Sequence, residues 1–485
     1  MASPSDERIF TSEFFFERGS DKGGRPELGS LKEPGRDIPV YRACDVLVVG
    51  GGPSGTAAAV AAAKLGADVI LLERYNHLGG LASGGMVLVL DDMWDSRHGE
   101  ISVRGICVEM IDRLARLNLA VFPRQDQWGD TLDRYRRWAR WGVFDFHSHT
   151  QPHPIIFAAS FDPDGWKRVS LELMEECGIE LRLHSWFSRA LVEDGRIGGV
   201  VCETKAGREA IFGDVVIDTT GDLDVAASAG APHVKGSYIM TTVFRLGGVD
   251  TDAAERFEYG EPAAFAELDK QAKKKIGGSW QHWWLKTPLP GVVWCNCPHM
   301  PGLDGLKVED LTRAEMQGRK HIAALLDFVR AHMPGFERCY LVDVAPQTGV
   351  RQTRLLAGEY VVDKEDLAAR TRFADTIARG RDYTTPYRAL LPRNVENLLV
   401  AGRHYSATPS AQKISREIPP CMAMGEAAGV AAAMALDAGV RVRDVDVAAL
   451  QKKLRAQGAD PGDHSGPNPD VPAIARAERD VEVAT

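Results

Sequence analysis

Three glycines and a later glutamate form the first group of residues whose types and spacing point to chemistry. Gly50, Gly52 and Gly55 fit the pattern Gly-x-Gly-x-x-Gly, and Glu73 follows 18 residues after the last glycine. In such a loop the glycines make the turn out of a strand, let the backbone approach a pyrophosphate and let a helix pack on the strand. A carboxylate at this spacing can accept hydrogen bonds from ribose hydroxyls. The pattern therefore indicates binding of a dinucleotide.

The segments around this loop have the order strand, loop, helix, strand. Residues 45–49 are a short apolar run rich in valine, which is typical of a buried parallel strand. An alanine-rich segment to about Leu65 predicts a helix, and residues 67–73 predict a second buried strand. The start of the helix would present free N–H groups and a positive dipole end to the phosphates. This context favours a dinucleotide site over a glycine-rich turn in an unrelated α/β domain.

A second glycine-rich loop, residues 78–85, bears on which dinucleotide is bound. NAD and FAD share the first fingerprint, but FAD is longer and lies extended. A second close approach of the backbone is therefore expected near its ribityl chain and ring. A flexible connector is the alternative, and the density of small residues makes it the weaker one. We predict FAD as the cofactor.

Five segments resemble the FAD-dependent oxidoreductase family related to the flavoprotein subunits of fumarate reductase and succinate dehydrogenase. The resemblance extends from about residue 41 to residue 440 and is specific for fold and cofactor but not for substrate. It implies an α/β protein with a Rossmann-type FAD-binding domain and an inserted α+β substrate domain. The matching segments are residues 45–55, 78–80, 218–222, 397–403 and 420–429.

The same resemblance implies which residues contact FAD. The turn at Thr220 and Gly221 would lie beside the adenosine half, and residues 186–188 would meet the adenine. The turn at Gly402 would lie near the ribityl chain, and residues 424–429 would form a helix start pointing at the flavin pyrimidine, where its positive end stabilises charge. Independently of the resemblance, residues 418–436 are rich in small residues and predict one long helix. The expected cofactor-binding residues are Gly50, Gly52, Pro53, Ser54, Gly55, Glu73, Arg74, Gly79, Gly80, Ala82, Ser83, Phe187, Thr220, Gly221, Asp222, Gly402, Arg403, Gly425, Ala427 and Ala428.

The sequence departs from relatives at two places. Many flavoproteins have Gly-Asp at the ribityl turn, whereas this chain has Gly402-Arg403, which weakens an aromatic-hydroxylase interpretation. His77 lies one residue out of register with the histidine to which some relatives attach the flavin, so noncovalent FAD is expected. No second Gly-x-Gly-x-x-Gly precedes a helix, so a separate NADPH-binding domain is not expected.

The candidate catalytic residues are His404, Tyr405, Arg416 and Arg351. In the related reductases the region before the last helix faces the substrate. His404 could act as a base toward a hydroxyl, because histidine titrates near neutral pH, or it could be a structural histidine bonded to a backbone carbonyl. Arg416 could clamp a carboxylate or carbonyl oxygen, and Arg351 could serve an anionic substrate. Ordinary ion pairs are the alternative for both arginines.

Composition and charge limit the classes of partner that the chain is expected to bind. The net charge of −9 argues against nucleic acid as a partner. The sequence contains no run of 18 apolar residues, so no membrane-spanning helix is expected. Eight scattered cysteines without Cys-x-x-Cys favour a reducing, cytoplasmic location. Histidines around 147–153 and the Cys295–His299 group do not have zinc-ligand spacing, so no metal is expected. A small-molecule substrate is expected, and a second copy of the chain or an electron-acceptor protein stays open as a partner.

The expected domain organisation is discontinuous. Residues 1–40 would form an N-terminal arm, and residues 41–85, 156–235 and 390–445 the FAD-binding domain. Residues 86–155 and 236–389, rich in tryptophan, would form the substrate or cap domain, and residues 446–485 a C-terminal tail.

The predicted function is an FAD-dependent oxidoreductase that transfers a hydride between a small organic substrate, an alcohol or an activated C–C bond, and the flavin. Two alternatives stay open: an oxidase that uses molecular oxygen, and a flavoprotein subunit that passes electrons to a partner protein.

Overall fold

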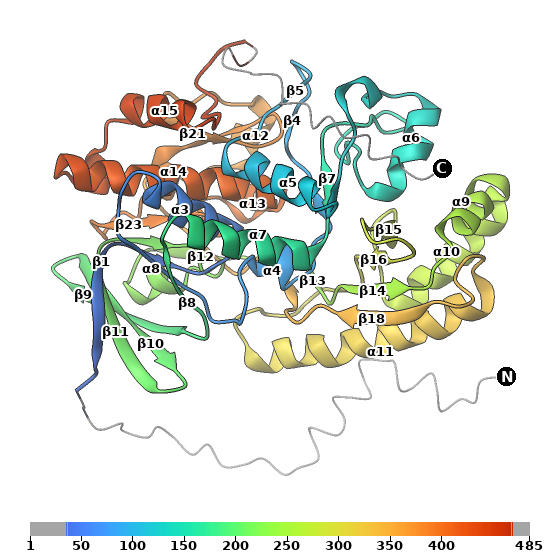
Figure 1. Cartoon of the computed structure of the whole chain (residues 1–485), viewed down its shortest axis with the longest axis horizontal. Helices are drawn as coiled ribbons and strands as arrows, with labels where there is room; N and C mark the ends of the chain where they lie inside the picture. Colours follow the sequence, from blue (N-terminus) through green and yellow to red (C-terminus); the bar gives the residue numbers. More distant parts are fainter. Residues whose placement is uncertain (1–34, 36, 467, 469–485) are drawn as a thin grey trace. The chain divides into compact units, whose positions relative to one another are not determined.

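The computed structural model describes residues 35, 37–466 and 468, which divide into two units (Figure 1). The large unit contains Val40–Ser237, Leu285–Pro290 and the described residues from Arg351 onward. The small unit contains mainly Tyr238–Trp284 and Gly291–Val350. Nearly all of the expected N-terminal arm, and the end of the expected tail, lie outside the described residues.

The large unit is built on one main sheet with a parallel centre. The strand order is β8-β2-β1-β11-β10-β9, and β23 also pairs with β11. All pairs among β8, β2, β1, β11 and β23 are parallel, while β10 is antiparallel to both of its neighbours. The parallel strands therefore end at one edge, where an α/β sheet binds its ligand. The strands are β1 (Val40–Val49), β2 (Val69–Leu72), β8 (Glu180–Arg182), β9 (Trp186–Glu193), β10 (Arg196–Thr204), β11 (Gly207–Asp218) and β23 (Leu398–Val400).

Alternating side chains of the central strands fill two separate cores. Val46 and Val48 pack in a cluster with α3 (Pro53–Ala63) and α14 (Ile418–Ala438). Leu47 and Val49 pack in a second cluster with residues of β10 and of the short helix α8 (Asp224–Ser228). Because both faces of the sheet are covered, the strands are continuous apolar runs. This explains why the run at residues 45–49 predicts a buried parallel strand.

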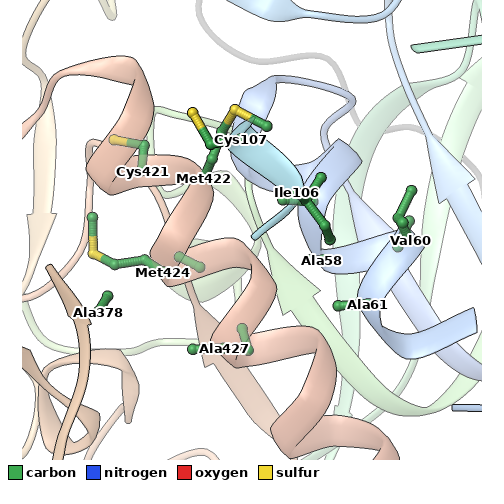
Figure 2. Packing of buried hydrophobic residues seen from close by; sticks show 14 of the residues in the cluster. Ala58, Val60, Ala61, Ile106, Cys107, Ala378, Cys421, Met422, Met424 and Ala427 are labelled. Atoms are coloured by element: carbon green, nitrogen blue, oxygen red, sulfur yellow. The ribbon is translucent and has the colours of Figure 1, made fainter. Parts of the chain in front are cut away.

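Helices α3 and α14 pack closely because glycines on α14 face the backbone of α3. A Cβ atom on Gly425 would overlap the carbonyl oxygen of Ser54, and one on Gly429 would overlap that of Ala58. Figure 2 shows Met424 and Ala427 of α14 with Ala58 and other residues of α3 in this cluster. The first turns of α3 therefore lie directly against α14, and any residue larger than glycine at these two positions would push the helices apart.

The large unit also contains regions that the sequence analysis assigned to the inserted domain or to the C-terminal tail. Residues 86–155 and 351–389, expected in the inserted domain, fall within the large unit. The expected tail begins with a regular helix, α15 (Val447–Ala456), whose Leu450 and Leu454 are buried in the main core. Other elements of the large unit are α4 (Gly80–Ser83), β3 (Val89–Leu90), β4 (Trp94–Asp95), β5 (Glu100–Ile101), α5 (Ile106–Arg116), β6 (Ala120–Val121), α6 (Leu132–Trp138), β7 (Ala159–Phe161), α7 (Pro163–Glu176), α8 (Asp224–Ser228), β12 (His233–Lys235), β20 (Arg354–Leu356), α12 (Lys364–Ala369), β21 (Thr376–Arg379), β22 (Thr384–Pro386) and α13 (Pro409–Ser415).

Among the described residues, the small unit combines short antiparallel strands with three helices. Its central strand β14 pairs with β16 and β18, and its longest helix is α11. Trp283, Trp284 and Phe336 are fully buried in its core, so these two tryptophans are packing residues. The elements are β13 (Met240–Thr241), β14 (Phe244–Gly247), α9 (Thr251–Gly260), α10 (Pro262–Ile276), β16 (Val293–Cys295), β17 (His299–Met300), α11 (Val308–His332), β18 (Tyr340–Val344) and β19 (Gly349–Val350).

Among the described residues, one helix has the length and composition of a membrane span. It is α14, and 72% of its most apolar 18-residue window is buried inside the protein. The apolar character of α14 is accounted for by its packing against α3 and the sheet.

Candidate functional site

The glycine loop after β1 has one glycine that the protein itself does not explain. Gly50 has φ +109°, and a Cβ atom there would lie 2.5 Å from the Thr219 carbonyl oxygen. A Cβ atom on Gly55 would overlap the Gly50 carbonyl oxygen. Gly52, in contrast, has φ −68° and ψ −177°, and its Cβ atom would meet nothing closer than 4.0 Å. Its lack of a side chain leaves room for a ligand, as the close approach of a pyrophosphate requires.

The N-terminus of α3 is open to an anion. Gly52 is its N-cap and supplies no side-chain hydrogen bond, and Pro53 occupies the first turn, where its missing N–H costs nothing. The buried Ser54 hydroxyl has no partner among the described residues. Free N–H groups, the positive dipole end and an unpartnered hydroxyl together fit a phosphate group.

Glu73 lies at the end of β2 and is tied to the glycine loop. It is 6% exposed; its Oε2 accepts a hydrogen bond from the Gly51 N–H at 2.7 Å, and its Oε1 accepts one from the Tyr75 N–H at 2.9 Å. Burial raises its pKa above the ordinary value. Each oxygen keeps a further lone pair, so the carboxylate can also accept hydrogen bonds from ribose hydroxyls.

The second glycine-rich loop contacts the first one directly. The Gly79 N–H donates to the Gly51 carbonyl at 2.7 Å, and a Cβ atom on Gly80 would lie 3.0 Å from the Gly52 Cα. The Ser83 hydroxyl donates to the Leu78 carbonyl at 2.5 Å and fixes the turn. Ala82 is completely buried. The two loops that the sequence singled out thus form one surface around Gly52.

A third turn, after β11, joins the same edge of the sheet. The Thr220 N–H and hydroxyl donate to the Asp218 carboxylate, and Gly221 has φ +82°. Asp222 accepts a hydrogen bond from the Thr353 hydroxyl at 2.6 Å and pairs with Arg403 at 2.8 Å.

The Gly402-Arg403 departure is explained by these contacts. A Cβ atom on Gly402, with φ +117°, would lie 3.3 Å from the Ser54 Cβ, so this turn lies at the start of α3. The Arg403 guanidinium lies over Gly221, where a Cβ atom would be 3.0 Å from its Nη2. Arg403 thus joins the turns after β11 and β23, and its Nη1 is buried without a partner among the described residues.

Aromatic and cationic side chains gather beyond Glu73. The Arg74 guanidinium lies 4.9 Å from the ring of Tyr75 and 5.4 Å from that of Trp186. Trp186 is 50% exposed, and Phe187 next to it on β9 is partly exposed. Such a group can stack on a base, as the resemblance implies for the adenine.

The resemblance placed the start of the last helix wrongly, whereas the run of small residues over 418–436 predicted this helix correctly. The helix does not start near residue 424 but at Ile418, about two turns earlier. Gly425, Ala427 and Ala428 lie inside it, buried against α3 and the core, so their N–H groups belong to the helix ladder. These residues position α3, and the helix end that could face a flavin is at Glu417 and Ile418.

The four candidate catalytic residues have mostly structural contacts. His404 is 1% exposed, and its Nε2 lies 3.1 Å from the Asp218 carbonyl and 3.2 Å from its carboxylate. The buried Tyr405 hydroxyl bonds to the Ser415 hydroxyl at 2.7 Å.

The arginines differ from one another. Arg416 pairs with Glu417 at 3.1 Å. Arg351 is partly exposed and anchors its backbone carbonyl to Gln412. This geometry favours the structural alternative for His404 and leaves the arginines as candidates.

Two groups of residues that resemble metal ligands have structural contacts of their own. Cys295 and Cys297 are buried, and burial raises the pKa of each thiol well above its ordinary value. Asp95, Glu100 and Asp460 converge elsewhere, but all three pair with the buried guanidinium of Arg379. A cation is therefore already present among these carboxylates.

Sequence reasoning missed one titratable cluster. Asp91 and Asp92 follow β3, and the Asp92 carboxylate accepts a hydrogen bond from the Tyr383 hydroxyl at 3.0 Å and lies 3.5 Å from His147 Nε2. Burial is the main cause that raises the pKa of both aspartates, and the charge of Glu417 also raises both, so Glu417 lies within electrostatic reach of them. The available signal was the Asp91-Asp92 pair six residues after the second glycine loop; Tyr383 lies 291 residues further along the chain.

Comparison with protein families gives a match over most of the chain. The model of a family described as FAD dependent oxidoreductase matches residues 45–382 and 379–454.

Curated relatives are more distant. The chain is 29% identical over 212 residues to digeranylgeranylglycerophospholipid reductase 2 of Methanopyrus kandleri, covering 43% of this chain and 46% of that protein. It is 43% identical over 70 residues to urocanate reductase of Eggerthella lenta, covering 14% and 12%. The chain therefore matches less than half the length of these relatives.

Two solved structures align with most of the chain at low sequence identity. A geranylgeranyl bacteriochlorophyll reductase-like protein from Thermoplasma acidophilum is 14% identical, with 86% of this chain and 83% of that chain covered and a TM-score of 0.44. The myxobacterial chondrochloren halogenase, an FAD-dependent halogenase, is 14% identical, with 86% and 79% covered and a TM-score of 0.46.

Proposed function

This chain belongs to the FAD dependent oxidoreductase family, and we propose that it transfers a hydride between a small organic substrate and the flavin of bound FAD. The substrate class is an alcohol or an activated C–C bond. The observation that carries the proposal is the meeting of two glycine loops at Gly52, beside the open start of α3.

Each part of this site has a task in holding the cofactor. Gly52 and the first turn of α3 would hold the pyrophosphate, and Glu73 would hold a ribose. The turn at Gly402 lies next to Ser54, where the chain between the phosphates and the ring would pass. When bound, FAD supplies a hydride acceptor or donor. The protein's own residues bind it, orient it and exclude water.

The relatives favour the reducing direction. Both curated proteins described above are named as reductases, and the one from E. lenta is a urocanate reductase. Arg351 and Arg416 are candidates for binding an anionic group of such a substrate, because a guanidinium presents a fork of donors to carboxylate oxygens.

The test is a substrate screen on the purified holoenzyme. Under anaerobic conditions, alcohols should bleach the flavin absorbance, and activated double bonds should restore it after chemical reduction. A panel of both classes that leaves the flavin spectrum unchanged would overturn the proposal. Hydrogen peroxide formed in air with substrate would support the oxidase alternative, and a co-purifying electron-acceptor protein would support the subunit alternative.

Gly52→Ala separates cofactor binding from folding. The backbone at Gly52 suits alanine, and the new Cβ atom would meet no protein atom within 4.0 Å, so the variant should fold. The methyl group would occupy the approach to the pyrophosphate, so bound FAD should fall at least about tenfold. Gly198→Ala is the control, because its Cβ atom would lie 3.9 Å from Phe212, far from this edge. Equal FAD content in both variants would contradict the assigned phosphate site.

A further inference from the structure

Asp92 is held in an unusual conformation by a network of titratable side chains. Its φ is +60°, a left-handed conformation that non-glycine residues rarely adopt, although aspartate does so more readily than most. The residue is buried, and its carboxylate lies 3.0 Å from the Tyr383 hydroxyl and 3.5 Å from His147 Nε2. Such strained positions persist where surrounding contacts hold them and are common at active sites.

The imidazole of His147 is the accessible member of this network. Its side chain is 45% exposed, whereas the Asp92 side chain behind it is 2% exposed. The His147 N–H of the backbone donates to the Asp145 carboxylate at 3.0 Å, and Asp145 is fixed in turn by Arg381 at 2.6 Å. With Nε2 directed to Asp92, Nδ1 is left for a ligand.

The network lies toward the N-terminal end of α14. Glu417 is the N-cap of that helix and acts on the carboxylates of Asp91 and Asp92. Eight residues separate Glu417 from Gly425, which contacts Ser54 at the start of α3; at 1.5 Å per residue this is about 12 Å. An extended FAD with its pyrophosphate at α3 would place its ring in this direction.

We propose that His147 is the proton donor and acceptor of the flavin reaction, with Asp92 as the residue that positions it. We call Asp91, Asp92, His147, Tyr383 and Glu417 the His147 cluster. The inference rests on the proposed hydride transfer and assigns the proton that such a transfer requires.

The proton and electron count is complete for a polarised double bond. A hydride adds to one atom of the bond, the π electron pair moves to the other atom, and that atom takes the proton as the His147 N–H bond breaks. The substrate gains two electrons and two hydrogens, and the flavin site supplies the hydride. Neutral His147 recovers a proton from water at its exposed side. Oxidation of an alcohol is the reverse, with His147 taking the hydroxyl proton.

Charge around the imidazole favours its protonated form. The hydrogen bond with Asp92 is the main cause that raises the pKa of His147 to about 9, and the charges of Asp92 and Asp91 also raise it. Burial and the charge of Arg381 lower it. Asp91 contributes less than Asp92, because burial and Glu417 raise the pKa of Asp91 well above its ordinary value and so favour its neutral form. His147 is therefore an acid at neutral pH, which matches the reducing direction.

The experiment uses three variants of the holoenzyme and a double-bond substrate from the screen. His147→Gln keeps a polar side chain but cannot transfer a proton, so anaerobic reoxidation of the reduced flavin should slow at least about 100-fold at pH 7.5. Asp92→Asn should let the imidazole return toward an ordinary pKa of about 6.5, slowing the reaction up to about tenfold at pH 7.5 with recovery near pH 6. His149→Gln, an exposed histidine two residues away, is the matched control.

The outcomes separate the two proposals. In wild type the rate should fall as pH rises through about 9, and this limb should be absent in His147→Gln. Independently of turnover, NMR titration of the His147 imidazole in the FAD-free protein should give a midpoint near pH 9 that moves toward about 6.5 in Asp92→Asn; an unchanged midpoint would overturn the positioning role. If wild type reacts with a substrate and His147→Gln reacts equally fast with the same pH profile, the inference is overturned while the proposed function stands. If wild type reacts with no substrate, the proposed function fails and the inference fails with it. A slow Asp92→Asn variant that does not recover at low pH would overturn the positioning role.

Discussion

Glu426 is a buried carboxylate in the middle of α14, and its substitution by glutamine should change how stability depends on pH. It is 2% exposed and accepts a hydrogen bond from the Ile106 N–H at 3.0 Å, which caps the start of α5. Gly105, the N-cap residue, offers no side chain for this purpose. Glu426→Gln keeps an acceptor of the same shape and removes the ability to ionise.

The magnitude follows from the pKa. Burial raises the pKa of Glu426 from its ordinary 4.5 to about 7. The folded state therefore holds this proton at pH values where the unfolded chain has lost it, so the free energy of unfolding falls as pH rises from about 4.5 to about 7. The shift of about 2.5 pH units corresponds to about 3 kcal/mol at 1.36 kcal/mol per unit, most of it between pH 5 and pH 8.

Urea unfolding at pH 5 and pH 8, with FAD in excess and circular dichroism as the signal, measures this difference. Wild type should lose about 2–3 kcal/mol more than Glu426→Gln over this interval. Glu109→Gln is the control. Glu109 pairs with Lys64 and Arg113 and its pKa is lowered, so it does not cause a loss of stability between pH 5 and pH 8, and this variant should lose as much stability as wild type. Equal losses in wild type and Glu426→Gln would refute the argument that a buried charge destabilises the folded state.

Two further predictions concern the cofactor edge. Gly55→Ala should destabilise the protein by at least about 2 kcal/mol in thermal unfolding even without FAD, because its Cβ atom would overlap the Gly50 carbonyl. His404→Ala removes the imidazole opposite the buried Asp218 carboxylate, so it should lower stability by about 3 kcal/mol and release FAD at lower temperature; unchanged melting with lost turnover would instead support His404 as a catalytic base.

The βαβ start of the chain could be predicted because its requirements are local. The valine run, the glycine spacing and Glu73 all lie within 29 residues, and the structure shows the backbone contacts that require glycine at Gly50 and Gly55. The family match confirms FAD as the cofactor and agrees with the expected fold class. Strand order was not accessible in this way, because β1 pairs with a strand that lies about 170 residues later.

The helix start shows a case in which resemblance misled and local signals were sufficient. Proline in the first turn marks the start of a helix, and Pro419 and Pro420 occupy that turn in α14. The resemblance implied a cofactor contact for residues 424–429, and small residues suit a cofactor contact and close helix packing equally well. In this protein Gly425 and Gly429 serve the approach of α14 to α3.

The His147 cluster could not be found from sequence because its members come from four distant segments. Asp92 and Tyr383 are 291 residues apart, and a histidine in a loop carries no sign of a carboxylate partner. His147 drew attention only for a metal site, since histidine spacing is the one pattern that a single sequence makes visible there. Its chemistry depends on the pairing with Asp92, which is a property of the fold.

Helix α14 connects the phosphate site at the start of α3 with the His147 cluster. It therefore determines the distance between the two. The middle of α14 contacts the backbone of α3 through glycines. No side chains separate the two helices at these points, so side-chain rearrangement there cannot absorb a shift of one helix against the other. The first residue of α14 follows Glu417, which acts on Asp91 and Asp92. A change that widens the α3–α14 contact would therefore move the proton-handling cluster relative to the phosphate site. Hydride transfer requires reacting atoms within about 3–3.5 Å, so a helix packed at backbone contact is a suitable support for this reaction.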